Sequence, residues 1–273
     1  MSIIKDEVYK FFAQYIYQNT GMVYAPNEYY RLDSRINDLV KFLNVKTVDE
    51  VYQMYRGAIS PDMRAILINI STNNETYFFR DGKPFTILCK NVLTELVTLY
   101  PTGSLNIWSA ASSTGQEAYS ILMSIKNSLP EDVFQRIFIS GSDISTQALK
   151  KATDGVYTGL EVQRGLPIQL LMKFFNQTGP ELWKIDQSLT SKVKFYEFNL
   201  LTGHYPKDQY HIVFCRNVLI YQDNDNKKNI LDKIYDSLKP GGYMFLGTGE
   251  SLIGIQSKFE RISFDGGAVY KKV

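Results

Sequence analysis

Small side chains cluster where an apolar segment gives way to a helical pattern, at Trp108-Ser109-Ala110-Ala111-Ser112-Ser113-Thr114-Gly115-Gln116-Glu117. Small residues let a ligand approach the backbone, and the N–H groups at a helix N-terminus are free to bind it. The Gly-x-Gly-x-x-Gly pattern of ordinary dinucleotide sites is absent. The segment therefore predicts either a nucleotide-like ligand site or a tight strand-to-helix turn without a ligand, and its residues leave both open.

A carboxylate follows the next apolar segment, at Asp143 in Ser142-Asp143-Ile144. In nucleotide-binding sheets a carboxylate at this place accepts hydrogen bonds from the ribose hydroxyls. The alternative is that Asp143 caps the helix predicted to begin near Thr146. Because the small-residue segment lies upstream in the same βαβ unit, the ribose contact is favoured.

An arginine, an amide and a phenol follow the fourth predicted strand, as Arg216, Asn217 and Tyr221. Ligands bind at the carboxyl ends of the strands in open parallel sheets, so these groups are placed to line a site. The alternative is a capping asparagine and a surface arginine, since both residue types are mostly exposed in proteins.

Two adjacent aromatic residues stand beside an arginine in the segment 73–80, as Phe78, Phe79 and Arg80. This pattern predicts a linker that inserts into the sheet domain or a wall of the ligand site. The residue types alone favour the inserted linker.

Short apolar segments alternate with helical patterns from Leu105 onward. The predicted strands are 105–109, 137–140, 193–198, 212–214 and 243–246, with a closing hairpin near 259–263 and 268–271. The predicted helices are 117–128, 146–152 and 227–238, the last ended by Lys239-Pro240-Gly241-Gly242, and 159–191 is an insertion. Strands alternating with helices indicate a parallel sheet covered on both faces, an α/β fold. The first 70 residues show only helical spacing, as at Val8, Phe11, Phe12 and Tyr15.

The composition narrows the class of protein. The 273 residues carry 30 Lys and Arg against 28 Asp and Glu, a net charge of +2, which argues against a broad nucleic-acid binder. Cys89 and Cys215 lie far apart, and the two histidines are His204 and His211, so we expect neither a disulfide framework nor a metal site. Without a signal peptide or a membrane-spanning segment, we expect a cytoplasmic location without membrane insertion.

Five segments occur in an order that resembles the CheR family, the chemotaxis receptor methyltransferases. They are Asn74-Glu75-Thr76-Tyr77-Phe78-Phe79-Arg80, Trp108 to Glu117, Ser142-Asp143-Ile144, Phe214-Cys215-Arg216-Asn217-Val218-Leu219-Ile220-Tyr221 and Leu238-Lys239-Pro240-Gly241-Gly242. Each alone is a weak signal, whereas five in order span essentially the whole chain.

The resemblance implies a reaction and an architecture. The reaction transfers a methyl group from S-adenosylmethionine to glutamate side chains of membrane chemoreceptors (methyl-accepting chemotaxis proteins), giving glutamate methyl esters and S-adenosylhomocysteine. The architecture is a small all-helical N-terminal domain at 1–70, a linker contributing to the cofactor site at 71–84, and a Rossmann-like S-adenosylmethionine-dependent methyltransferase domain at 85–273. The insertion at 159–191 corresponds to a small inserted β-subdomain.

The resemblance also assigns site residues. Arg80 and Tyr221 are the expected catalytic residues, Arg80 to steer the substrate carboxylate and Tyr221 to hold it or the methyl donor. The residues expected to bind the cofactor are Asn74, Thr76, Arg80, Glu117, Asp143, Asn199, Leu200, Arg216 and Asn217. A glutamate carboxylate, with a reference pKa of about 4.3, is ionised at neutral pH, so no strong general base is required.

The chain departs from the family pattern in two places. Members commonly carry two acidic residues and a proline where this chain has Gln116, Glu117 and Ala118; because Glu117 is retained, we expect cofactor binding. The turn at Gly179-Pro180 is shorter than in members that dock on a receptor's C-terminal tether, which leaves tether binding open.

The expected receptor-docking surface is a basic helix face that carries Arg31, Arg35 and Lys41. Family members use the corresponding helix, and the methylation regions of receptors are acidic helices. The alternative is an ordinary solvated helix face.

Two other functions are compatible with the sequence. One is a non-catalytic module that senses S-adenosylmethionine or S-adenosylhomocysteine, and the other is a methyltransferase of the same fold that acts on another protein or a small molecule. Arg80, Arg216, Asn217 and Tyr221 together favour the enzyme, because a sensor has less need of substrate-facing groups. The helical domain argues against a small-molecule substrate, because it adds surface rather than a pocket.

Overall fold

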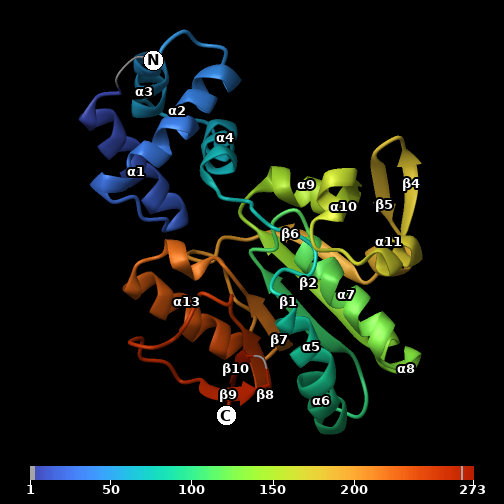
Figure 1. Cartoon of the computed structure of the whole chain (residues 1–273). Coiled ribbons are helices and arrows are strands. Elements are labelled where there is room, and N and C mark those ends of the chain that lie inside the picture. The colour runs from blue at the N-terminus through green and yellow to red at the C-terminus, as the bar shows by residue number, and fades with distance from the viewer. Residues whose placement is uncertain (1–3, 266) are drawn as a thin grey trace.

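A mixed sheet lies at the centre of the computed structural model, which describes residues 4–265 and 267–273 (Figure 1). Within those ranges seven strands pair in the order β6-β2-β1-β7-β8-β10-β9. They are β1 (Leu105–Ala110), β2 (Ile137–Asp143), β6 (Val193–Glu197), β7 (Tyr210–Cys215), β8 (Leu238–Phe245), β9 (Glu260–Phe264) and β10 (Gly267–Lys271). The first five in this order pair in parallel, and β10 runs antiparallel to β8 and β9. The α/β prediction is confirmed.

The order of the strands fixes where a ligand site belongs. The chain passes outward from β1 through β2 to β6 and then returns to place β7 on the other side of β1. This reversal creates a switch point between β1 and β7, where the loops after neighbouring strands diverge and leave a crevice at their carboxyl ends.

Helices cover both faces of the sheet, and each face has its own apolar core. Successive side chains of a strand point to opposite faces. Accordingly, Ile107 and Phe214 belong to one buried cluster, whereas Trp108 and Val213 belong to the other. The covering helices are α5 (Lys83–Ile87), η2 (Leu88–Val92), α6 (Leu93–Leu99), α7 (Gln116–Ser128), α8 (Glu131–Gln135), α9 (Thr146–Asp154), α13 (Asn224–Ser237) and the short η3 (Leu219–Tyr221).

The last long helix ends at Ser237, within one residue of its predicted end, but β8 begins at Leu238 rather than at the predicted residue 243 and includes the predicted stop signal, Lys239 to Gly242. The helices between Lys83 and Leu99 were not predicted at all. Their middle turn, η2, is a π-helix, which adds a residue to the turn and shifts the apolar spacing away from the regular α-helical period.

The N-terminal residues fold into a separate helical domain, at the upper left of Figure 1. It contains α1 (Asp6–Thr20), η1 (Pro26–Glu28), α2 (Tyr30–Phe42), α3 (Val48–Arg56) and α4 (Pro61–Ser71). Its core is a cluster of its own that includes Phe12, Leu32 and Val51. Thr47 caps α3 and Ser60 caps α4, each through its side-chain oxygen.

A small antiparallel sheet extends from the central domain, at the right of Figure 1. Its order is β3-β5-β4. Its elements are β3 (Val156–Thr158), α10 (Gly159–Gln163), α11 (Ile168–Phe174), β4 (Phe175–Gly179), β5 (Leu182–Ile185) and α12 (Gln187–Thr190). The sheet begins before the predicted boundary at residue 159, because β3 directly follows α9.

Candidate functional site

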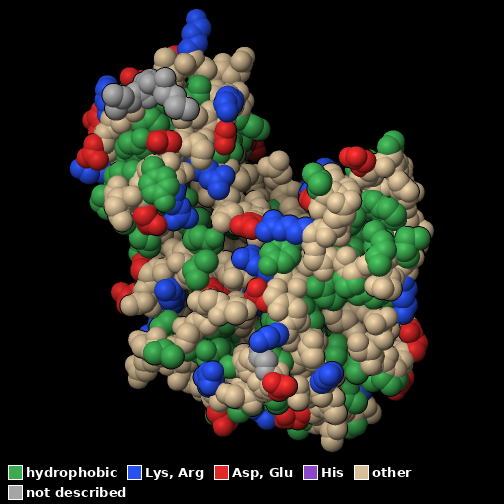
Figure 2. Space-filling model, viewed as in Figure 1, with side chains coloured by type: hydrophobic (Ala, Val, Ile, Leu, Met, Phe, Trp, Pro, Cys, Tyr) green, Lys and Arg blue, Asp and Glu red, His purple; other side chains and the backbone are tan. Residues whose placement is uncertain are grey.

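One cavity collects every residue that the sequence nominated for catalysis or cofactor binding. It encloses about 990 Å³ of empty space, which includes the solvent at its open mouth. The nominated residues on its wall are Asn74, Thr76, Arg80, Glu117, Asp143, Asn199, Leu200, Arg216, Asn217 and Tyr221. In Figure 2 the surface is hollowed between the helical domain and the small sheet, and charged side chains of both signs gather there.

The small-residue segment forms the turn between β1 and α7 at this cavity. Ala111 and Ser113 have left-handed backbones, with φ of 59° and 51°, a conformation that costs energy in residues other than glycine. The Ser113 N–H donates to Asp143 Oδ2 at 2.8 Å, and the Ser112 N–H donates to the Ser142 carbonyl at 2.8 Å. The turn is thereby fixed to the end of β2, with its backbone facing the cavity.

Asp143 is the last residue of β2 and is 6% exposed. Its Oδ1 accepts the Ser145 N–H at 2.9 Å, and burial raises the pKa of its carboxyl group despite the backbone N–H groups that bind it. The cap of α9 is Ser145, whose Oγ accepts from the Ala148 N–H. The capping alternative for Asp143 is therefore wrong. A carboxylate has about four acceptor positions, so acceptor capacity remains for a ligand.

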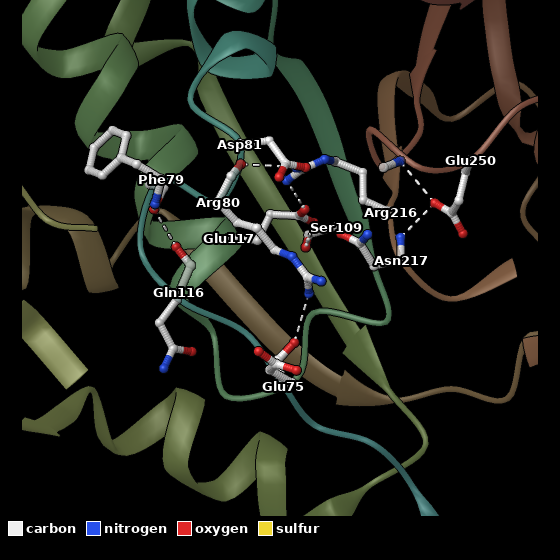
Figure 3. A network of polar contacts seen from close by, with 12 residues as sticks. Glu75, Phe79, Arg80, Asp81, Ser109, Gln116, Glu117, Arg216, Asn217 and Glu250 are labelled. Carbon is white, nitrogen blue, oxygen red and sulfur yellow. Dashed lines mark hydrogen bonds and ion pairs between the residues drawn. The ribbon is translucent and has the colours of Figure 1, made fainter. Parts of the chain in front are cut away.

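Glu117 and Arg216 form a buried ion pair at the switch point (Figure 3). Arg216 Nη1 lies 3.0 Å from Glu117 Oε2, and Nη2 lies 2.7 Å from Asp81 Oδ2 and donates to the Arg80 carbonyl. Ser109 donates to the other Glu117 oxygen at 2.7 Å. The Arg216 side chain is 1% exposed, so the alternative of a surface arginine is wrong. Arg216 instead holds Glu117 and the linker in place.

The burial of Asp81 raises its carboxyl pKa, but hydrogen bonds from Thr248 and the nearby Arg216 guanidinium outweigh burial, so its net pKa lies below the ordinary value. Asp81 therefore stays charged at neutral pH. Its negative charge compensates the positive charge of the buried Arg216 guanidinium.

The linker ahead of α5 both inserts into the core and lines the cavity. Phe78 is fully buried and packs edge-on against Tyr157 and Phe175 of the small sheet. Its neighbours Asn74 and Thr76 face the cavity. The segment thus inserts into the core through Phe78, as one alternative predicts, and lines the cavity through Asn74 and Thr76.

Two arginines flank an aromatic ring at the mouth of the cavity. Arg80 lies over Tyr77 at 5.7 Å and donates to the Glu75 carbonyl at 2.9 Å, whereas Arg164 lies over the same ring at 4.4 Å. Arg164 also pairs with the Glu75 carboxylate at 2.6 Å. That pairing lowers the pKa of Glu75. The mouth therefore presents cationic groups on an aromatic support.

Tyr221 lies in the loop that follows β7 (the β7 loop) and is hydrogen-bonded to residues from earlier in the chain. Tyr221 Oη accepts from Asn73 Nδ2 at 2.8 Å, and the Tyr221 carbonyl accepts the Val23 N–H at 3.0 Å. Because the hydroxyl oxygen accepts from Asn73, its own proton is free to be donated to a ligand.

The cavity wall also contains residues that the sequence did not nominate. Thr20 and Met22 come from the end of α1 and the segment after it, and Gln222 comes from the sheet domain, just after η3. Met22 forms a β-bridge with Gln222, whose Nε2 donates to the Thr20 carbonyl at 3.1 Å. These contacts join residues about 200 positions apart, so no local motif signals them.

Asn199 also forms a hydrogen bond between the sheet domain and the helical domain. Its Nδ2 donates to the Asn19 carbonyl at 2.8 Å, and its Oδ1 accepts the Leu201 N–H at 2.9 Å. A ligand beside Asn199 and Leu200 would therefore meet mainly backbone and the apolar Leu200 side chain.

The donor and acceptor groups of the wall fit an adenosine-containing cofactor. Asp143 has free acceptor positions for ribose hydroxyls, and the Asn199–Leu200 segment provides a surface beside a base. Among the described residues, four buried side-chain polar atoms have no hydrogen-bond partner, and those of Ser112, Arg216 and Gln222 belong to this wall. Native proteins leave few such atoms unpaired, so their concentration here is typical of a polar binding site.

The described residues contain no group of three or more His, Cys, Asp and Glu side chains that could hold a metal ion. None of their helices is both long and apolar enough to cross a membrane.

Comparisons with known proteins point to one family. Residues 74–267 match the family model described as CheR methyltransferase, SAM binding domain. The chain is 35% identical over 263 residues to chemotaxis protein methyltransferase Cher2 of Pseudomonas putida, covering 95% of this chain and 96% of the relative. It is 34% identical to chemotaxis protein methyltransferase 1 of Pseudomonas aeruginosa, covering 96% and 97%. It is 33% identical to the chemotaxis protein methyltransferase of Vibrio parahaemolyticus, covering 98% of each chain.

Proposed function

The chain belongs to the CheR methyltransferase family, whose cofactor is S-adenosylmethionine, and we propose that it methylates glutamate side chains of membrane chemoreceptors. The products are glutamate methyl esters and S-adenosylhomocysteine. The observation that carries this proposal is the single cavity lined by all ten nominated residues. The curated relatives named as chemotaxis protein methyltransferases, matched over nearly their full lengths, support the same activity.

The wall residues take distinct roles in cofactor binding. Asp143 accepts hydrogen bonds from the ribose hydroxyls, and Asn199 and Leu200 flank the adenine. Glu117, held by Arg216, lies with Asn217 toward the reacting end, and Asn74 and Thr76 border the cofactor from the linker. This order follows the sheet, because Asp143 ends β2 whereas Arg216 and Asn217 follow β7 across the switch point.

The substrate glutamate needs orientation rather than activation. Its carboxylate is ionised at neutral pH, so the enzyme needs no strong base. When bound, the cofactor supplies a methyl carbon on a cationic sulfur; the new O–C bond forms as the C–S bond breaks, leaving the electron pair on sulfur and transferring no proton.

Arg80 and Tyr221 orient the carboxylate. Arg80 gives one N–H to the Glu75 carbonyl, and a guanidinium has five N–H donors, so others remain for the substrate. Tyr221 donates its O–H to the carboxylate or to the methyl donor while accepting from Asn73. Together these residues align the reacting atoms and exclude water.

Receptor docking uses the basic face of α2. Arg31 pairs with Glu28 at 2.9 Å, and Lys41 pairs with Asp38 at 3.4 Å. Arg35 has no ion-pair partner among the described residues. Arg35 therefore makes the largest contribution to attraction of an acidic receptor helix.

The test is transfer of label from methyl-tritiated S-adenosylmethionine to purified cytoplasmic fragments of chemoreceptors. Glutamate methyl esters release volatile labelled methanol in alkali, and the expected result is alkali-labile label on the receptor that falls sharply with Tyr221→Phe. Alkali-stable label would contradict esterification and indicate another acceptor group. Binding of S-adenosylhomocysteine without any label transfer would favour the sensing module instead.

A further inference from the structure

We propose that Glu250 is a positioning residue that fixes the β7 loop, and with it Asn217 and Tyr221, at the reacting end of the cavity. This inference rests on the proposed function, because it concerns the orientation of groups that meet the methyl donor and acceptor. Glu250 lies in the loop after β8 and belongs to none of the five sequence segments.

The Glu250 carboxylate accepts three backbone N–H groups from two loops, and Figure 3 shows its bond to Asn217. Its Oε2 accepts from Asn217 at 2.6 Å and from Gly247 at 2.8 Å, and its Oε1 accepts from Ile220 at 3.2 Å. Because β7 and β8 are parallel neighbours, their following loops emerge side by side. One anion therefore joins them, through hydrogen bonds that are stronger than those to a neutral acceptor.

The backbone of the loop turns sharply at Asn217. This residue has a left-handed φ of 59°, a conformation that asparagine adopts more readily than other residues with a side chain. Gly247 leaves the space for its side chain, since a Cβ at Gly247 would lie 2.6 Å from Asn217 Nδ2. The turn is thus held by the Glu250 carboxylate and by close packing on Gly247.

Glu250 also completes the support of Tyr221. Asn73 and Val23 hold the Tyr221 hydroxyl and carbonyl from the N-terminal side, and Glu250 holds the preceding Ile220 N–H from the sheet side. Without Glu250, the loop between Asn217 and Tyr221 loses its hydrogen bonds to the loop after β8 and keeps those to Asn73 and Val23. We expect its side chains to lose alignment while the ribose and adenine contacts on β2 and the Asn199 loop persist.

The experiment compares Glu250→Ala and Glu250→Gln with the wild-type chain in steady-state receptor methylation, S-adenosylhomocysteine calorimetry and hydrogen exchange. For Glu250→Ala we expect kcat to fall about 10- to 100-fold, as for misplacement of reacting groups, with the Kd for S-adenosylhomocysteine changed by less than about three-fold. Glu250→Gln keeps one carbonyl acceptor and should give an intermediate kcat. The amides of Asn217, Ile220 and Gly247 should exchange faster in both variants.

Two further variants separate positioning from general destabilisation. Gly247→Ala places a Cβ 2.6 Å from Asn217 Nδ2 and 2.9 Å from Glu250 Oε2, so it disturbs the same contact from the other loop and should lower kcat in the same way. Asp186→Ala removes another carboxylate that accepts a backbone N–H, that of Ser188 at the start of α12, and should leave kcat within about two-fold.

The inference is overturned if Glu250→Ala keeps the wild-type kcat, or if its whole effect is lost cofactor affinity. Unchanged amide exchange in the β7 loop would also overturn it. A wild-type chain that methylates no receptor would refute the proposed function, and the exchange measurement would still report whether Glu250 holds the loop.

Discussion

Asp143 uses one carboxylate for two purposes. It fixes the turn after β1 and the start of α9 through the Ser113 and Ser145 N–H groups, and it keeps acceptor positions for the proposed ribose contact. The cost of burying its charge is visible in its raised pKa. Such a cost is typical of a functional position rather than of a residue selected for stability.

We predict that Asp143→Ala weakens S-adenosylhomocysteine binding by about 1.5–3 kcal/mol, the range for lost hydrogen bonds to a charged group. Calorimetry measures the change. Ser60→Ala is the control, because it removes the cap of α4, costs about 1 kcal/mol of stability and touches no cavity residue. Unchanged affinity in a folded Asp143→Ala protein would refute the ribose contact.

The residue types and their places singled out Asp143, Arg216, Asn217 and Tyr221, and the family resemblance added Glu117 and the other cofactor-binding residues, but neither identified the residues that support them. Asp143 stood out because a carboxylate directly follows a predicted strand. Glu250 was missed because its partners are backbone N–H groups. Almost every residue type carries such a group, so no sequence motif marks the contact. Gln222 and Thr20 were missed because their contact joins two domains.

Strand β7 carries a buried histidine that must be neutral to accept a hydrogen bond from the adjacent strand. His211 is 2% exposed, and its Nδ1 accepts the Asn106 N–H of the neighbouring β1 at 3.0 Å. Burial, with the nearby Lys239 and Arg136 charges, lowers the pKa of His211 from 6.5 to about 4. The folded protein thus resists protonation that the unfolded chain accepts.

We predict that stability is constant above pH 6.5 and falls as the pH drops from 6.5 to about 4. Between these pH values His211 of the unfolded chain binds a proton that the folded chain does not bind. The free energy of unfolding therefore decreases by about 3 kcal/mol in total. Urea denaturation across this pH range measures it. His211→Gln keeps an acceptor for the Asn106 N–H and should flatten the slope; an equally steep slope in that variant would assign the effect to other groups.

The elements of the sheet were predictable to within a few residues, since buried parallel strands read as continuous apolar segments. β7 is buried along its entire length. The helices from Lys83 to Leu99 were not predicted, because the π-helical turn at Leu88–Val92 breaks the regular spacing. The β-subdomain was expected only from the family resemblance, since β4 and β5 are short and largely exposed.

At the scale of the whole molecule, the end of α1 closes the cavity against the sheet domain. Gly21 ends α1 with φ of 71°, and a Cβ there would lie 2.1 Å from Gln222 Oε1. The close approach allows the bond between Gln222 and the Thr20 carbonyl. The contact between the two domains is therefore part of the wall of the cavity in which we propose that the cofactor binds.

We predict that Gly21→Ala lowers both the melting temperature and the affinity for S-adenosylhomocysteine. The left-handed backbone alone costs about 1–2 kcal/mol in alanine, and the added methyl group displaces Gln222. Gly57→Ala is the matched control, because its nearest atom is Met54 O at 3.7 Å and its φ is negative. Wild-type affinity in Gly21→Ala would show that docking and binding are independent.

We predict that Arg35→Glu raises the KM for receptor more than Arg31→Glu, and that the double variant has the largest effect with unchanged cofactor affinity. Arg31 is already paired with Glu28 and lies over the Tyr24 ring at 5.4 Å. The difference should shrink with salt, because the Debye length falls from about 10 Å at 0.1 M to about 3 Å at 1 M. Lys228→Glu on α13 is the control reversal. Normal receptor methylation by the double variant at low salt would place docking elsewhere, most plausibly on the small sheet.

The most direct test of the central claim is a crystal structure of this chain with S-adenosylhomocysteine. The account predicts the ligand in the cavity between α1, the linker and the sheet, with ribose at Asp143, adenine beside Asn199 and Leu200, and sulfur toward Arg80 and Tyr221. A ligand outside this cavity, or one whose sulfur lies at the Asn199 end, would contradict it.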